Sequence, residues 1–191
     1  MGGDLWQGGC QCGAVRYEFT VRPDNPCICH CRMCQKQFGN FFGSFAGAHT
    51  DFFRLTRGTL SVFRSSEDAE RGFCRDCGTP LTYKAVSRPR ISVSIGSLDR
   101  HSEMKPQFQY GMEACEPWLS EIVSLPGTRT GDGDNGEGDT PERFALIRDT
   151  NRQHPDYPTS EWPAGPDPAS SSGAAAATAR TPHRGRGKRS P

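Results

Sequence analysis

The stretch Cys74-Arg75-Asp76-Cys77-Gly78 has the form of a zinc knuckle, in which two thiolates lie on one tight turn. Its glycine can adopt a positive φ angle, so that backbone amides can turn toward the sulfurs. Cys10-Gln11-Cys12-Gly13 is a shorter version of the same pattern. A closed zinc site needs four ligands in a tetrahedron, and the two turns together supply four. The alternative interpretation of these four cysteines is that they are buried thiols that bind no metal. We expect a structural zinc to be bound by the four cysteines of these turns: Cys10, Cys12, Cys74 and Cys77.

A second cluster, Cys29-His30-Cys31-Arg32-Met33-Cys34, offers three closely spaced thiolates and has no second knuckle to complete it. Three protein ligands and an open position for water or substrate are the pattern of a catalytic zinc. Soft sulfur ligands favour zinc over magnesium or calcium, although their chemistry also admits copper(I). We expect a second, catalytic zinc to be bound by the three cysteines of this cluster: Cys29, Cys31 and Cys34.

Alternatives for the second site depend on its fourth ligand. Cys27 or the distant Cys115 could close it into a four-ligand structural site, and each could instead be a buried small hydrophobic residue. His30 lies between two ligands, so we expect its side chain to point away from the metal. An iron–sulfur centre is the remaining alternative, but the spacing does not match the ferredoxin patterns.

The nine cysteines form an odd number in a chain of 191 residues. The first six residues have neither the basic start nor the apolar core of a secretory signal. We therefore expect a reducing, cytoplasmic location, where a disulfide framework is disfavoured. No apolar run approaches the ~20 residues of a membrane-spanning helix, so no membrane partner is expected.

Apolar residues repeat with a period of two far more often than with the period of a helix. Residues 15–21 and 91–95 alternate apolar and polar side chains, which predicts two half-buried strands. Shorter strands are predicted at 41–45, 59–63 and 80–84. Short helices are predicted at 32–38, 117–123 and 141–148, the last with a capping Thr140. The expected fold is mainly β: a small antiparallel domain clasped by zinc, with short helices.

Composition divides the chain into four segments. They are a zinc domain at 5–126, a flexible Gly/Asp-rich loop at 127–139, a helix and docking segment at 140–163, and a disordered basic tail at 164–191. Aromatic residues such as Tyr157 and Trp162 would anchor the docking segment to the domain.

The basic tail could bind nucleic acid through phosphates, although short Arg-rich termini are also common as solubilising extensions. It carries five Lys or Arg against one acid, which gives +4. Since the whole chain is +1, residues 1–163 carry −3. The near-neutral total thus combines a mildly acidic body with a basic tail.

Residues 5–126 resemble the glutathione-dependent formaldehyde-activating enzyme (GFA) family, whose domain is also called the CENP-V/GFA domain. The resemblance rests on three ordered motifs, at residues 8–17, 29–34 and 71–81. It implies a mainly-β zinc fold of the β-tent type, with a structural zinc on the first and last cysteine pairs and a catalytic zinc on the middle triad. It also implies a carbon–sulfur lyase that reversibly joins formaldehyde and glutathione into S-hydroxymethylglutathione.

The resulting hypothesis is that a small thiol, ionised at the second zinc, attacks an aldehyde carbon. No acid–base residue is assigned; His30 and His49 are the nearest histidines in the sequence, and both are expected to be surface or loop residues. One alternative is a binding module with two structural zincs that contacts nucleic acid through its tail. A third interpretation is a degenerate site that only sequesters metal.

Overall fold

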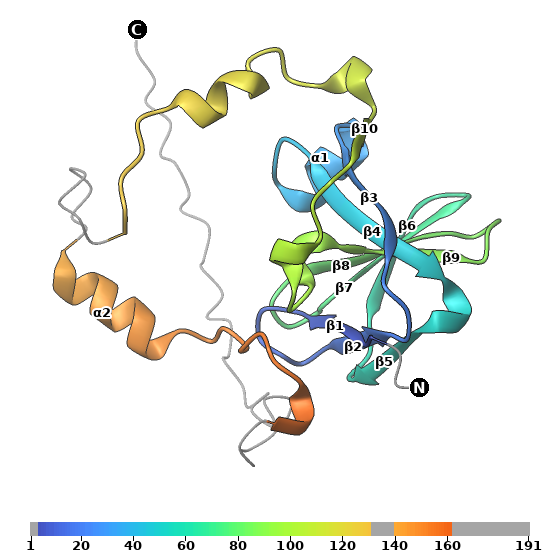
Figure 1. The fold of residues 1–191 in the computed structure, drawn as a ribbon, viewed down its shortest axis with the longest axis horizontal. Helices are drawn as coiled ribbons and strands as arrows, with labels where there is room; N and C mark the ends of the chain where they lie inside the picture. Colours follow the sequence, from blue (N-terminus) through green and yellow to red (C-terminus); the bar gives the residue numbers. More distant parts are fainter. Residues whose placement is uncertain (1–3, 131–139, 162–191) are drawn as a thin grey trace, which may run out of the picture.

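The computed structural model describes residues 4–130 and 140–161, which form two β-sheets with short helices around them (Figure 1). The smaller sheet contains β1 (Trp6–Gly9), β2 (Arg16–Phe19) and β5 (Phe53–Arg57), in the order β1-β2-β5. The larger sheet contains β3 (Asp24–Cys29), β4 (Gly43–His49), β6 (Ser61–Ser66), β7 (Ala69–Phe73), β8 (Pro80–Ala85), β9 (Arg90–Ser94) and β10 (Phe108–Tyr110). Its order is β10-β3-β4-β9-β8-β7-β6. The mainly-β prediction is confirmed.

One strand pair departs from the antiparallel expectation. β10 pairs with β3 in parallel, with Tyr110 opposite Cys29. The chain leaves β9 in the middle of the sheet and returns at the free edge of β3 in the same direction as β3. A parallel pair requires such a crossover connection. Through it, β10 covers the edge of β3 beside the cysteine-rich segment.

The predicted helices are present, the first with the predicted bounds and the other two with adjusted ones. They are α1 (Arg32–Phe38) and α2 (Pro141–Thr150), and the segment predicted at 117–123 is the 3-10 helix η5 (Leu119–Ser124). The hydroxyl of Thr140 accepts a hydrogen bond from the Arg143 amide, as the predicted cap requires. The other 3-10 helices are η1 (Thr50–Phe52), η2 (Ile95–Ser97), η3 (His101–Glu103), η4 (Met112–Ala114) and η6 (Thr159–Glu161). None of the described helices is long and apolar enough to cross a membrane.

β2 is buried on both faces, which corrects the prediction of a half-buried strand. Its polar residues Arg16 and Glu18 are only 3% and 5% exposed. Arg16 is buried because the Asp99 carboxylate accepts two hydrogen bonds from its guanidinium, at 2.9 and 2.5 Å. Glu18 accepts a hydrogen bond of 2.7 Å from Arg54 on β5. The alternation of apolar and polar residues predicted the strand. It could not show that Asp99 and Arg54 cover the polar face of the strand.

The main core lies between the sheets and includes the buried Trp6, Tyr17, Phe19, Leu81 and Val93. A second buried cluster of Cys27, Cys34 and Phe45 packs where α1 meets β3 and β4. Both cysteine-rich regions therefore adjoin packed side chains.

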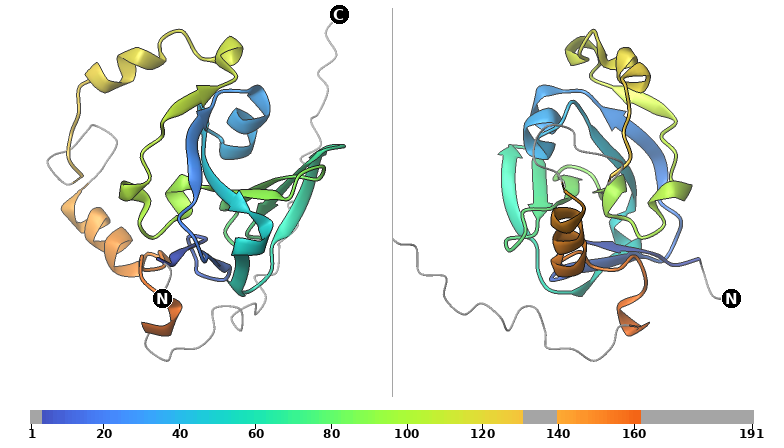
Figure 2. Two further views of the ribbon diagram at one scale, coloured as in Figure 1. Left: turned by 45° about the vertical axis from the view of Figure 1, so that its right-hand side comes forward. Right: turned by 90° about the vertical axis from the view of Figure 1, so that its left-hand side faces the viewer.

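The C-terminal segment returns to the smaller sheet after α2. α2 buries none of its residues and lies beside the sheets (Figure 2). Beyond it, the His154 amide donates a hydrogen bond of 2.6 Å to the Gln11 carbonyl, and the His154 side chain is buried. Most of the predicted flexible loop, Trp162, Pro163 and the whole predicted tail lie outside the described residues.

Candidate metal centres

The structure brings together the sulfurs of Cys10, Cys12, Cys74 and Cys77, here called the cage; all four lie within 4.8 Å of one another. The Sγ atoms of Cys10 and Cys12 are 3.6 Å apart, and those of Cys12 and Cys74 are 3.8 Å apart. In a tetrahedral zinc site with Zn–S bonds of about 2.3 Å, neighbouring sulfurs are about 3.8 Å apart. The cage thus fits a tetrahedral ion of this size.

Both cage turns use the same backbone device. The amides of Gly13 and Gly78 donate to the carbonyls of Cys10 and Cys74, at 3.1 and 2.9 Å. Each glycine has φ of 76°, which confirms the predicted positive φ. The Val15 amide also donates to the Cys10 sulfur at 3.2 Å. Such amide-to-sulfur hydrogen bonds stabilise a thiolate and orient it toward a metal.

The sulfurs of Cys29, Cys31 and Cys34, here called the triad, also lie within 4.8 Å of one another. Cys29 ends β3, Cys31 caps α1, and Cys34 follows in the first turn of the helix. The carbonyl of Cys31 accepts from the amides of Cys34 and Gln35, which places Cys31 and Cys34 on one side of the turn. Cys34 is buried, whereas Cys29 and Cys31 are partly exposed, so the triad opens toward solvent.

A segment that the sequence did not single out supports the triad. The His30 amide donates to the Tyr110 carbonyl at 2.9 Å, which fixes the backbone between Cys29 and Cys31. Gly111 follows with φ of 65°, and a Cβ there would lie only 2.8 Å from the Cys31 nitrogen. The sequence around Gly111 has no hydrophobic periodicity from which its position could be predicted. Its contact with Cys31 follows from the pairing of β10 with β3.

His30 lies in the connection between β3 and α1, as expected of a loop residue, but it is fully buried, which corrects the expectation of a surface position. Because it alternates with Cys29 and Cys31, its ring points into the protein, where Nε2 lies 2.8 Å from the Gln109 amide oxygen. It is not among the side chains whose ligand atoms gather at the triad. His49 is 45% exposed and accepts a hydrogen bond from the Asp51 amide.

The two remaining cysteines belong to neither group within the described residues. Cys27 is buried in the second core cluster, and its burial raises the pKa of its thiol to about 11. Cys115 is partly exposed and donates a weak hydrogen bond to the Glu116 carbonyl at 3.7 Å. Cys27 therefore matches the role of a small packed side chain, whereas Cys115 lies partly exposed outside both core clusters.

Each cluster contains one thiol that ionises readily. A hydrogen bond from the Cys34 thiol lowers the pKa of Cys29 to about 5 against the opposing effect of burial. Burial would raise the pKa of Cys77, but hydrogen bonds from the Thr79 hydroxyl and amide lower it to about 6. Burial raises the pKa of Cys10. At neutral pH each cluster therefore presents a thiolate, the form that binds metal.

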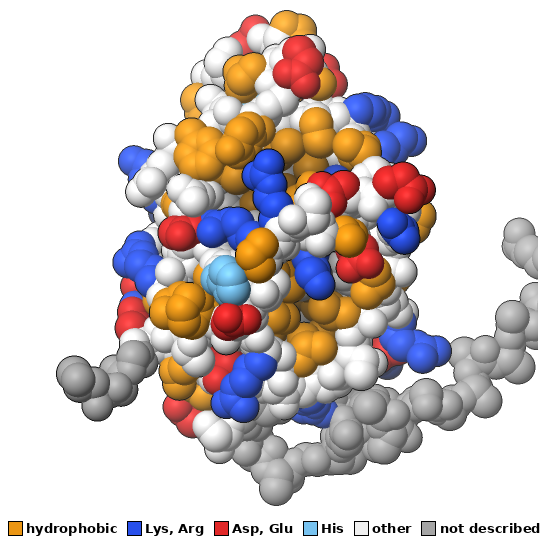
Figure 3. Space-filling view, turned by 90° about the vertical axis from the view of Figure 1, so that its right-hand side faces the viewer, with side chains coloured by type: hydrophobic (Ala, Val, Ile, Leu, Met, Phe, Trp, Pro, Cys, Tyr) orange, Lys and Arg blue, Asp and Glu red, His pale blue; other side chains and the backbone are white. Residues whose placement is uncertain are grey.

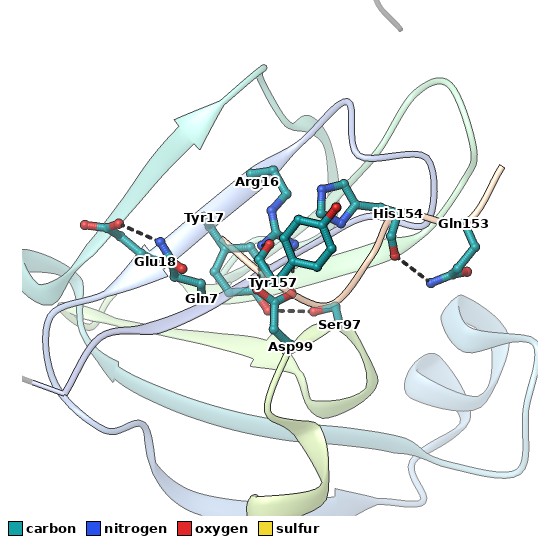
Figure 4. A network of polar contacts seen from close by, with 9 residues as sticks. All are labelled: Gln7, Arg16, Tyr17, Glu18, Ser97, Asp99, Gln153, His154 and Tyr157. Carbon is teal, nitrogen blue, oxygen red and sulfur yellow. Dashed lines mark hydrogen bonds and ion pairs between the residues drawn. The ribbon is translucent and has the colours of Figure 1, made fainter. Parts of the chain in front are cut away.

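A cavity of about 350 Å³ lies between the Cys10 turn of the cage and the C-terminal segment. Arg16 and Asp99 line it from the body of the fold, and Gln153, His154 and Asp156 line it from the C-terminal segment. Figure 4 shows how the side chains of His154 and Tyr157 lie beside Arg16. The C-terminal segment thus supplies part of the lining of this cavity.

Comparison with known proteins gives one family. The family model described as glutathione-dependent formaldehyde-activating enzyme matches residues 5–113, which is more than half of the chain. This span contains both cysteine clusters. It ends before α2 and the segment that lines part of the cavity.

Two individual proteins are similar over shorter spans. A curated Schizosaccharomyces pombe protein, named an uncharacterised lyase, is 27% identical over 78 residues. The alignment covers 41% of this chain and 56% of that relative, so it spans little more than half of the relative's length. The crystal structure of a Rhodobacter sphaeroides protein aligns with 24% identity and a TM-score of 0.45, covering 53% of this chain and 98% of that chain.

Proposed function

Because the chain belongs to the glutathione-dependent formaldehyde-activating enzyme family, we propose that it is a zinc-dependent carbon–sulfur lyase. It would reversibly join formaldehyde, or a related aldehyde, to glutathione or another small thiol. The observation that carries the proposal is the difference between the two sulfur clusters. Four sulfurs complete a tetrahedral site, whereas three leave one position for a substrate.

In the proposed reaction, the thiol sulfur bonds to the carbonyl carbon and the thiol proton passes to the carbonyl oxygen. The product is an S-hydroxymethyl thioether, and the reverse step breaks the carbon–sulfur bond. Zinc bound by the triad would supply an open position at which a thiol ionises near neutral pH. The cage, with two of its sulfurs almost fully buried, would serve stability alone.

Large, exposed side chains lie in the elements that carry or adjoin the triad: α1, β10 and η4. Tyr110 pairs with Cys29 across β10 and β3, so the two side chains lie on the same face of the sheet. Tyr110, Met33 and Met112 are each more than half exposed. We infer that these apolar groups would shield a bound aldehyde from water while leaving a path for the thiol.

The test is an isotope-exchange measurement by NMR, with labelled formaldehyde and glutathione at equilibrium. The reaction also proceeds spontaneously, so the expected result is a faster exchange with zinc-loaded full-length protein than in buffer. C34S, which removes a triad sulfur, should return the rate to the spontaneous value. C27S removes a buried thiol from the same strand region and should retain the acceleration.

A wild-type protein that binds zinc at both clusters but accelerates exchange with no small thiol would sink the proposal. If C34S were as fast as wild type, the acceleration would come from elsewhere in the chain, and the triad would lose its assigned role.

A further inference from the structure

We propose that Arg71 is the counter-ion of the triad, a positioning residue that lets these three cysteines hold a divalent metal as an electrically balanced unit. This inference rests on the proposed function, since it concerns the same metal site. It assigns a role to a buried cation that the cysteine pattern does not include.

Arg71 extends from β7 into the second core cluster and is only 3% exposed. Its Nη2 donates to the Cys34 sulfur at 3.6 Å. Its other nitrogens donate to the Ser65 hydroxyl, at 3.0 Å, and to the Gln37 side-chain oxygen. The guanidinium also lies over the Tyr83 ring, 5.3 Å from its centroid. These contacts fix the direction in which Arg71 faces Cys34.

The charge of Arg71 has no carboxylate partner among the ion pairs of the described residues. A buried guanidinium is costly unless an anion compensates it. Arg16 shows the ordinary solution: it is equally buried, and Asp99 accepts two of its hydrogen bonds. For Arg71, the facing groups that can carry a negative charge are the sulfurs of the triad, of which Cys34 accepts its hydrogen bond.

The charges of the triad then balance. Three thiolates contribute −3, a divalent metal +2 and Arg71 +1, which sums to zero. A substrate thiolate would bring the site to −1, whereas without Arg71 it would reach −2. Arg71 therefore favours both the loaded triad and the entry of an anionic fourth ligand.

The cage offers an internal comparison. Four thiolates and a divalent metal sum to −2, and the Cys10 sulfur accepts from the Val15 amide at 3.2 Å instead of from an arginine. Removing Arg71 should therefore weaken the triad and leave the cage unchanged. A loss of global stability would affect both.

The experiment measures cobalt(II) binding by full-length protein, because sulfur-to-cobalt charge-transfer absorption reports each thiolate site directly. A chelator competition separates the two ions, and C34S identifies the phase that belongs to the cage. We expect R71M to weaken cobalt binding at the triad by about 10- to 100-fold, the usual effect of losing a group that hydrogen-bonds a metal ligand. R71K retains the charge and should recover part of the affinity.

R64M is the matched control, because Arg64 lies on the neighbouring β6 and its side chain is 58% exposed. Equal cobalt affinity of R71M and wild type at the triad would overturn the inference, and so would an equal weakening of cage and triad. The proposed lyase function fails by a different result: tight cobalt or zinc binding at the wild-type triad without acceleration of exchange.

Discussion

Gly111 is the residue on which the geometry of the triad depends most closely. Its φ of 65° is unfavourable for any residue with a side chain, and its Cα faces the backbone of Cys31. Gly39, which ends α1, has a similar φ of 57°, but a Cβ added there would have no neighbouring atom within 4 Å. Comparing alanine substitutions at Gly39 and Gly111 therefore separates the cost of the backbone conformation from the cost of close packing.

G39A should cost about 1–2 kcal/mol of unfolding free energy, the typical penalty of a left-handed conformation. G111A should cost more, because its Cβ would lie 2.8 Å from the Cys31 nitrogen and displace it. Urea denaturation measures both costs, and metal analysis should show loss from the triad only in G111A. Equal costs with unchanged metal content would show that Gly111 tolerates a side chain.

Individual ligand exposure also predicts how the two metal sites respond to a chelator. Two of the four cage cysteines are buried, Cys10 at 2% and Cys74 at 0% exposed, against one of the three triad cysteines. The triad also lacks a fourth protein ligand among the described residues. One zinc should therefore be released much faster than the other, and C34S should retain only the slow phase. Two equally slow ions would contradict an open triad.

At the scale of elements, β2 connects the smaller sheet to the C-terminal segment. Arg16 on β2 binds Asp99 and also donates to the Tyr157 carbonyl at 3.4 Å (Figure 4). The His154 amide adds a bond to Gln11, in the cage turn that precedes β2. A segment outside the matched family span is thereby attached to the same turn that carries two cage sulfurs.

The His154 ring reports this attachment. Burial, together with the nearby Arg16 cation, lowers its pKa from 6.5 to about 4. Between these values the detached segment binds more protons than the attached one, so attachment weakens as the pH falls from about 6.5 to 4. An NMR titration of the ring should give a midpoint near 4. A midpoint near 6.5 would show that the ring is exposed in solution.

The elements that sequence could predict carry a local signal. Period-two alternation indicated β2 and β9, and a capping threonine followed by proline indicated the start of α2. β7 and β10 have no such alternation, because their positions depend on partners distant in the chain. The cysteine spacing suggested both clusters, but Arg71 and Gly111 approach the triad from β7 and from the end of β10. Only tertiary structure brings them there.

At the scale of the whole molecule, charge is distributed unevenly along the chain but mixed on the visible surface. Acidic, basic and hydrophobic side chains are interspersed on the face turned away from α2 (Figure 3). Residues 1–163 carry −3, and the net positive charge that could attract phosphates lies in 164–191. The body and the terminus can therefore be tested separately.

Deletion of residues 164–191 should leave zinc content and thiol–aldehyde exchange unchanged, since both clusters and the contacts of the C-terminal segment precede it. Exchange by NMR and anisotropy of a labelled oligonucleotide at two salt concentrations measure the two activities. Salt-sensitive oligonucleotide binding that disappears with the deletion, combined with no exchange activity, would instead favour the binding-module alternative.

The cage spans a long stretch of chain, since Cys12 and Cys74 are 62 residues apart, whereas the triad comes from residues 29–34. During synthesis the triad sulfurs leave the ribosome together, but the first half of the cage waits for the second. Closing a loop of this length costs on the order of 4 kcal/mol of chain entropy. A metal that spans both halves would offset this cost, so metal supply would set when the cage closes.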